Sequence, residues 1–219
     1  MRRPEGAKAT KFRRVAEFLV CVALAFGALF LIRTSRFGIN AFDANTQIDP
    51  NTDAATRAKW AQRLDLLGLP NFYQVSDNLY RGAQPTAEGM KQLEKLGIKT
   101  VVNLRSVRSD REELDGTGLA YEHIKMTTWN TETEDVVRFV QIVTDKNRTP
   151  VFVHCRHGAD RTGMMCAIYR IAVQGWSKDE AIEEMTKGGF GFHRLWRNLV
   201  DYIHNMDIDD MKRRAELKD

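Results

Sequence analysis

Cysteine is scarce in this chain of 219 residues, which contains only Cys21, Cys155 and Cys166. Three cysteines do not make a disulfide framework, and they fit a cytosolic domain and an extracytoplasmic domain equally well. Cysteine usage therefore leaves the compartment open. With 43% hydrophobic residues, the chain is long enough to bury one ordinary core and to carry an appendage as well.

Net positive charge is also missing from most of the chain, although its formal net charge is +4. Residues 1–14 carry a net charge of +5, residues 15–32 contain only Glu17 as a charged residue, and residues 33–219 sum to zero. The basic character therefore belongs to an N-terminal tail, and we expect no nucleic-acid partner. Internal repeats and low-complexity tracts are absent too.

A long apolar run follows the basic tail, from Phe18 to Ile32, and it extends to Val15 if Glu17 lies at an interface. A transmembrane helix usually needs about 17–25 residues and the apolar region of a signal peptide about 7–15. Arginines follow the run in place of the small residues of a cleavage site. We therefore predict an uncleaved, single-pass membrane anchor over 15–32. The basic tail predicts a cytoplasmic N-terminus with the domain outside, although Arg33 and Arg36 oppose this orientation.

The remaining chain divides into a polar linker over 33–52, a globular domain over 53–206 and a charged, solvated tail over 207–219. The apolar periodicity predicts helices that alternate with strands. The expected helices are 54–67, 86–96, 132–144, 162–174, 177–188 and 193–206, and the expected strands are 72–75, 79–81, 98–104, 119–126 and 151–154. This alternation predicts an α/β fold with a mainly parallel central sheet flanked by helices.

The most informative segment runs from His154 to Gly163 and reads His-Cys-Arg-His-Gly-Ala-Asp-Arg-Thr-Gly. It joins a buried strand to a helix, so a tight loop meets a helix N-terminus. Backbone N–H groups and the positive end of the helix dipole would hold a dianion there. The same surroundings favour the nucleophilic thiolate form of Cys155. Arg161 offers a planar fork of donors for two phosphoryl oxygens.

Other residues of the segment complete this interpretation. Thr162 can donate its hydroxyl to the cysteine sulfur, and Gly158 permits backbone angles that a closed cradle needs. His154, next to the nucleophile, is expected to brace the loop. Arg156 and His157 are expected to line the mouth, with Ala159 and Gly163 completing the binding loop. His154, Cys155 and His157 match no zinc-ligand spacing, so we expect no metal site.

The pattern His-Cys-X5-Arg-Thr-Gly resembles the phosphate-binding loop of the protein tyrosine phosphatase superfamily, on its dual-specificity side. The upstream runs 78–85 and 97–105 are similar to the compact atypical branch of that family. The resemblance covers about residues 71–206. It implies a cysteine-dependent phosphatase in which Cys155 attacks phosphorus, Arg161 and the loop amides stabilise the phosphoryl oxygens, and water cleaves the thiophosphate intermediate. It implies no metal or organic cofactor.

The residue that protonates the leaving group is less clearly marked. In the wider family an Asp between a strand and the next helix usually has this role, and the matching segment here offers Glu132, Glu134 and Asp135. These residues are also good first-turn residues of a helix. Asp160 is the competitor, because Asp directly before the loop arginine resembles the loops of myotubularin-like lipid phosphatases. We favour Asp160 over Asp135, with fixing Arg161 or a helix N-terminus as its alternative role.

The substrate is not determined by the loop. Phosphorylated proteins, with phosphotyrosine or phosphoserine/threonine, are the first expectation, and phosphoinositides or soluble inositol phosphates are the alternative. An inactive phosphate-binding module is a second alternative, although such relatives commonly lose the Cys or the Arg. Arg81 and Arg105 are either further anion contacts or partners in salt bridges.

Overall fold

The computed structural model describes residues 48–217. The predicted basic tail over 1–14 and the predicted anchor over 15–32 lie outside these residues, so both stay predictions. Within 48–217, none of the helices combines the length and the apolar character that crossing a membrane requires.

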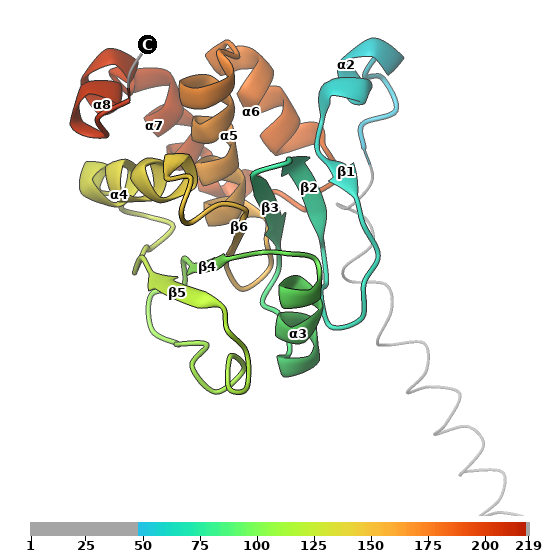
Figure 1. Ribbon diagram of the computed structural model, residues 1–219. Helices are drawn as coiled ribbons and strands as arrows, with labels where there is room; N and C mark the ends of the chain where they lie inside the picture. The colour runs from blue at the N-terminus through green and yellow to red at the C-terminus, as the bar shows by residue number, and fades with distance from the viewer. Residues whose placement is uncertain (1–47, 218–219) are drawn as a thin grey trace, which may run out of the picture. The chain divides into compact units, whose positions relative to one another are not determined.

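A sheet of six strands forms the centre of the described domain, in the order β1-β2-β3-β6-β4-β5 (Figure 1). The strands are β1 (Gln62–Arg63), β2 (Tyr73–Ser76), β3 (Leu79–Gly82), β4 (Thr100–Asn103), β5 (Ala120–His123) and β6 (Val151–His154). The helices are α2 (Ala54–Lys59), α3 (Ala87–Lys95), α4 (Thr133–Thr144), α5 (Asp160–Gln174), α6 (Lys178–Lys187), the short 3-10 helix η2 (Arg194–Trp196), α7 (Arg197–Asn205) and α8 (Ile208–Arg214).

Four of the strands run parallel, which confirms the predicted type of sheet. β3 and β4 lie on either side of β6, and β5 pairs with β4, all in parallel register. β1 and β2 add an antiparallel edge. His154, the last residue of β6, is level with Gly82 of β3 and Asn103 of β4. The loops that leave these strands therefore emerge at one edge of the sheet, which is where α/β proteins commonly bind ligands.

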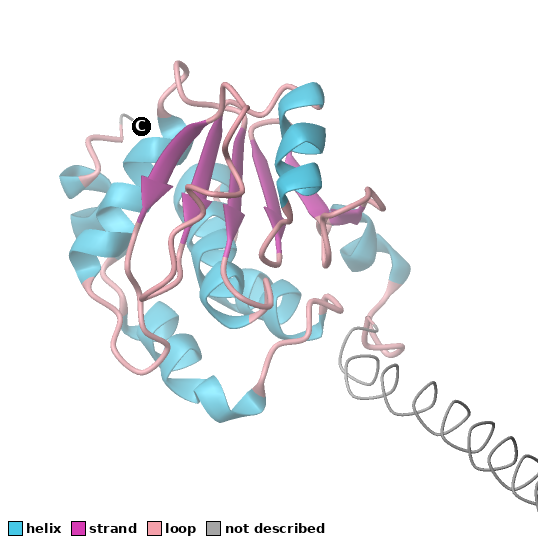
Figure 2. Cartoon of the chain, turned by 90° about the horizontal axis from the view of Figure 1, so that it is seen from below, coloured by secondary structure: helices cyan, strands magenta, loops and turns pink. Residues whose placement is uncertain are grey.

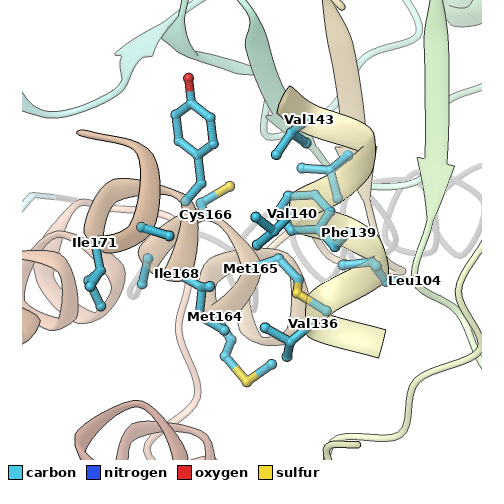
Figure 3. Close-up of a cluster of buried hydrophobic side chains, with 14 of the residues drawn as sticks. Leu104, Val136, Phe139, Val140, Val143, Met164, Met165, Cys166, Ile168 and Ile171 are labelled. Atoms are coloured by element: carbon cyan, nitrogen blue, oxygen red, sulfur yellow. The ribbon is translucent and has the colours of Figure 1, made fainter. Parts of the chain in front are cut away.

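Helices cover both faces of the sheet (Figure 2). Side chains along each strand alternate between the two layers. Val102 and Val153 face a large cluster that includes α4, α5, α6, α7 and α8. Val101 and Phe152 face a smaller cluster under α3. In the larger cluster, apolar side chains of α5 such as Met165 pack against α4, as Figure 3 shows. This packing fixes α5, and with it the loop that precedes α5.

Several predicted helix boundaries are confirmed by their caps. Asp53 accepts a hydrogen bond from Thr56 N, and Thr86 accepts one from Gly89 N. Ser177 and Glu180 form a reciprocal capping box at the predicted start of α6. Side-chain oxygens thus satisfy backbone N–H groups that have no partner inside their own helix. These local signals were readable from the sequence.

The predicted helix over 54–67 is wrong beyond Lys59. Trp60 is extended and buried, Ala61 N donates to Glu184 Oε1 at 2.6 Å, and Gln62 and Arg63 pair with β2. Tertiary contacts thus replace the helical bonds that the apolar spacing predicted. The helix predicted over 193–206 is likewise divided into η2 and α7.

Parts of the predicted tail and of the predicted linker are packed on the domain. Residues 208–214 form α8, whose Met211 is buried in the core, and Ala215 is buried after it, so the expectation of a solvated tail is wrong there. Within the predicted linker, Asp49 N donates to the carbonyl of Lys187, and Thr52 is buried. Ile208 and Leu217 also pack against the core, so apolar contacts hold the 208–217 segment, whereas a backbone hydrogen bond holds the segment at Asp49.

Candidate functional site

The segment from His154 to Gly163 folds as a strand, a tight loop and a helix. β6 ends at His154, residues 155–159 form the loop, and α5 begins at Asp160. Cys155 is a buried free cysteine on this loop. Ala159, the N-cap of α5, makes no side-chain cap bond. The loop thus leads directly into a helix N-terminus, an arrangement that favours a bound anion.

Gly158 allows the loop to close against β3. Its φ is 70°, and a Cβ at this position would lie 2.4 Å from both the carbonyl carbon and the oxygen of Gly82. Only glycine combines this positive φ with such close backbone contact. The backbone of the loop at Gly158 therefore packs directly against Gly82 at the end of β3.

Arg81 of β3 holds the loop by a hydrogen bond to its backbone. The residue is 1% exposed, its Nη2 donates to the Gly158 carbonyl at 2.7 Å, and its guanidinium lies 3.8 Å from the ring centroid of Phe190. Among the described residues it forms no salt bridge. The structure thus gives Arg81 a third role, besides the two that we expected, as a buried cation that holds the loop backbone.

His154 is fully buried and connects the loop to a carboxylate. Its Nε2 lies 2.8 Å from Asp110 Oδ2, and its Nδ1 lies 3.3 Å from the Cys155 carbonyl oxygen. Each ring nitrogen of His154 therefore faces an oxygen atom. The other Asp110 oxygen accepts from Arg105 Nη2. The predicted bracing contact of His154 is therefore present, together with an acidic partner that we did not expect.

Arg161 connects the loop to the segments that follow β4 and β5. Its Nη1 donates to the carbonyls of Leu104, at 3.1 Å, and Met126, at 3.2 Å, which follow β4 and β5. Its Nε is buried without a hydrogen-bond partner in the described part of the chain. One part of the guanidinium is thus held by the protein, and a donor remains for a ligand.

Thr162 does not make the predicted bond to the cysteine sulfur. The residue is fully buried, and its Oγ1 has no hydrogen-bond partner within 48–217. A buried hydroxyl without a partner costs free energy. The bond to sulfur that the sequence predicted is therefore not formed in this structure.

Asp160 holds His193. Its Oδ1 accepts from His193 N at 2.9 Å, and its Oδ2 lies 2.9 Å from His193 Nδ1. The His193 ring lies 5.9 Å from that of His157 in the loop. Burial, followed by nearby Arg156, lowers the pKa of His157. Asp160 thus fixes the chain after α6 against the loop, whereas the alternative role that we expected was to fix Arg161 or a helix N-terminus.

The three acidic residues before and within α4 lie in different surroundings. Glu134 pairs with Arg214 of α8, and Glu132 is the exposed N-cap of α4 without a side-chain cap bond. Asp135 is half-buried, and its pKa is raised, first by burial and then by Glu132. The segment that carries them begins after Met126, whose carbonyl accepts from Arg161. It therefore starts beside the loop.

A cavity of about 420 Å³ opens beside the loop. Its wall consists of Gln84, Arg105, Ser106, Val107, Arg108, Arg156 and Arg161. Four of these seven residues are arginines and none is acidic. Gln84 follows β3, the segment 105–108 follows β4, and the other two belong to the 155–161 region. The shared edge of the parallel strands therefore builds one cationic wall.

Two residues that support the site were not recognised in the sequence. Asp110 lies in the loop after β4, and no spacing relates it to His154, which is 44 residues away. Asn71, with a φ of 54°, donates from Nδ2 to the carbonyls of His157 and Phe190. Only the positive φ that asparagine tolerates gives a local signal for Asn71. The contact partners of both residues come from the tertiary fold.

Known proteins match the part of the chain that contains the sheet and the 154–163 loop. A family described as "DSP-PTPase phosphatase fused to NAD+ Kinase" matches residues 69–198. The dual specificity protein phosphatase TpbA of Pseudomonas aeruginosa PAO1 is 36% identical over 168 residues, which cover 73% of this chain and 72% of TpbA. Inositol diphosphatase DSP5 of Arabidopsis thaliana is 27% identical and covers 67% of this chain and 74% of its own.

A solved structure shows the same architecture. The crystal structure of P. aeruginosa TpbA in complex with pTyr superposes with a TM-score of 0.65 at 32% sequence identity. The superposition covers 73% of this chain and 98% of that chain. The match therefore extends over nearly all of the TpbA domain.

Proposed function

This chain belongs to the dual-specificity and atypical branch of the protein tyrosine phosphatase superfamily and is a phosphoric monoester hydrolase, and we propose that it acts through a phosphocysteine on Cys155. The observation that carries the proposal is the loop itself. A buried free cysteine and an arginine with an unpartnered donor stand at the two ends of a loop that opens a helix. Such a loop binds a phosphoryl dianion in front of the sulfur.

The reaction has two displacement steps. Cys155 Sγ attacks phosphorus, the S–P bond forms, and the bond from phosphorus to the ester oxygen breaks. Arg161 and the loop N–H groups stabilise the equatorial oxygens during this transfer. Water then attacks phosphorus, the S–P bond breaks, and inorganic phosphate and the thiolate are released. Thr162 is the proposed donor to the leaving sulfur, although its hydroxyl needs to rotate or shift to reach it.

For the proton donor we propose Asp135 rather than Asp160. Both Asp160 oxygens are engaged by His193, so the carboxylate is already committed to a contact within the protein. Asp135 has no such partner among the described residues, and its raised pKa favours the protonated form that a general acid needs. Its position at the start of α4 also follows the strand-to-helix segment that carries the acid in the wider family. This proposal reverses the order that the sequence favoured.

Phosphorylated protein is the first proposed substrate class, with phosphotyrosine as its aryl ester. The support is the similarity to TpbA, a dual specificity protein phosphatase for which a complex with pTyr is known. Inositol phosphates are the second candidate. The wall of four arginines without an acidic residue favours a polyanionic substrate, and one relative is an inositol diphosphatase.

The mechanism is tested by replacing Cys155 with serine. Cys155→Ser is expected to abolish hydrolysis of a generic aryl phosphate and to retain binding of phosphate, because the cradle survives without its nucleophile. EDTA is expected to leave wild-type turnover unchanged. Undiminished hydrolysis by the variant would refute the cysteine mechanism. Phosphate binding by a wild-type protein that releases no phosphate from any ester would show an inactive binding module.

The substrate class is tested with a panel of equal ester concentrations. Phosphotyrosine, phosphoserine and phosphothreonine peptides are compared with phosphoinositides in micelles and with soluble inositol polyphosphates, by phosphate release. A higher kcat/KM for phosphopeptides supports the first class. A higher kcat/KM for the inositol compounds supports the second. Each substrate is also run with Cys155→Ser, so that release by a contaminating phosphatase is recognised.

A further inference from the structure

The cationic cavity holds more positive charge than one phosphoryl group requires. A phosphoryl group in the 155–161 loop is served by the loop amides and by Arg161. Arg105, Arg108 and Arg156 remain in the wall, with Gln84 as a further amide donor. Arg108 and Arg156 are exposed and form no ion pair within residues 48–217. The cavity therefore has an unused capacity for a second anion.

Arg105 is the fixed part of this wall. It is 6% exposed, its Nε donates to Asn103 Oδ1 at 3.2 Å, and its Nη2 donates to the Ser109 carbonyl at 3.1 Å. Nη2 also pairs with Asp110. These bonds orient the guanidinium before any ligand arrives, so little side-chain entropy is lost on binding.

Asp110 contacts His154 as well as Arg105. One Asp110 oxygen faces Arg105, and the other lies 2.8 Å from His154 Nε2. A single carboxylate is thus shared between a guanidinium and a buried imidazole. Asp110 is not among the residues that line the cavity, so the wall as a whole, with its four arginines and no acidic residue, attracts an anion.

We propose that this cavity binds a second phosphoryl group of a small polyphosphorylated molecule whose first phosphoryl group occupies the Cys155 loop. Arg156 and Arg161 belong both to the loop region and to the cavity wall, so the two phosphoryl groups have to lie close together. A compact polyphosphate has its phosphoryl groups close together already, whereas a longer peptide would lose conformational entropy when it is ordered in the site. The inference rests on the phosphatase reaction proposed above and selects the second of its two substrate classes.

The test compares inhibitors of aryl phosphate hydrolysis by the full chain. Inorganic phosphate, inorganic pyrophosphate and inositol hexakisphosphate are used as probes, and the ratio of their inhibition constants is measured. We expect the two polyphosphates to inhibit competitively and at least about tenfold more strongly than phosphate, because further charge-assisted hydrogen bonds form. Arg108→Gln and Arg156→Gln should each reduce this ratio by about tenfold.

Arg111→Gln is the matched control. Arg111 is an exposed arginine close in sequence to the cavity segment, but its guanidinium lies 5.9 Å from the Tyr121 ring and it is not part of the wall. This variant removes the same charge and should keep the wild-type ratio. If the ratio of inhibition constants falls equally in all three variants, only the net charge of the protein matters for inhibition. That result would refute the subsite.

Two further outcomes separate this inference from the proposed reaction. Equal inhibition by phosphate and both polyphosphates, in an enzyme that hydrolyses the aryl ester, would refute the subsite and leave the reaction intact. A doubly phosphorylated peptide that inhibits more strongly than inositol hexakisphosphate would replace the small molecule by a protein substrate. If the wild-type protein hydrolyses nothing, calorimetric titration of Cys155→Ser with pyrophosphate and phosphate still measures the ratio and decides the subsite.

Discussion

His154 Nε2 lies 2.8 Å from Asp110 Oδ2, and both side chains are completely buried. This contact joins the residue before the nucleophile to the loop after β4. Because Asp110 also pairs with Arg105, it connects the nucleophile loop to the wall of the cationic cavity. Removing the charge of one residue in such a buried group leaves its partners without a counter-charge. We therefore expect a substitution of Asp110, which contacts both Arg105 and His154, to have a large effect.

Asp110→Asn is expected to lower kcat/KM for an aryl phosphate by about 10–100-fold, the equivalent of one charge-assisted hydrogen bond of about 1.5–3 kcal/mol. The amide keeps the size of the carboxylate but loses the charge that orients His154. The rate of Cys155 alkylation by iodoacetamide should fall with it and shift in its pH dependence. Asp110→Glu, which keeps the charge, should recover part of the activity. An unchanged alkylation profile would show that Asp110 supports the fold and not the nucleophile.

Asp135→Asn should slow the hydrolysis of alkyl phosphates by about 10²–10⁴-fold. Hydrolysis of an activated aryl phosphate should slow much less, because only the alkyl leaving group needs a proton. The acid works in its protonated form, so activity is lost as pH rises through its pKa. Since burial raises the pKa of Asp135, this basic limb should begin above the ordinary pKa of an aspartate and disappear in the variant. The profile of kcat/KM against pH measures it.

Asp160→Asn is the comparison for that experiment. If Asp160 only holds His193, its loss should slow both ester types equally and leave the basic limb in place. A selective loss on the alkyl ester in this variant would restore Asp160 as the acid. A selective loss in neither variant directs the test to Glu132 and Glu134.

Gly158→Ala should disrupt the loop and lower thermal stability. The left-handed backbone costs a non-glycine residue about 1–3 kcal/mol, and the new Cβ meets the Gly82 backbone as well. Calorimetric unfolding and phosphate binding are the measurements. Gly116→Ala is the control, because Gly116 also has a positive φ but open space around its Cβ position. Equal effects of the two substitutions would mean that contact with β3 is unimportant.

The N-terminal segment is tested in the full chain. A reporter fused after Ile32 should behave as extracytoplasmic, because six basic residues precede the apolar run. The full-length protein should sediment with membranes until detergent is added. A reporter that is active only in the cytoplasm would reverse the orientation. Recovery of a shortened, soluble protein would show a cleaved signal peptide.

The sequence alone determined the type of sheet, most helix starts and the reactive loop. These features depend on local chemistry: alternating strand and helix patterns, caps such as Ser177, and a cysteine and an arginine at fixed spacing before a helix. The strand-loop-helix order also determined that the loop would lie at the carboxyl edge of the sheet. Because the motif His-Cys-X5-Arg-Thr-Gly is continuous in the sequence, the resemblance to the phosphatase family was visible from the sequence as well.

Only the tertiary structure decided how the supporting residues are used. Asp110 reaches His154 because β4 and β6 are neighbours, and Asp160 holds His193 because the chain after α6 returns to the loop. Likewise, the early end of α2 and the docking of α8 depend on Glu184 and Met211 in the packed core. These contacts join residues tens of positions apart, and no periodicity or spacing encodes such a distance. Physically, local patterns set the elements, whereas burial and hydrogen bonding between distant elements decide what each polar side chain does.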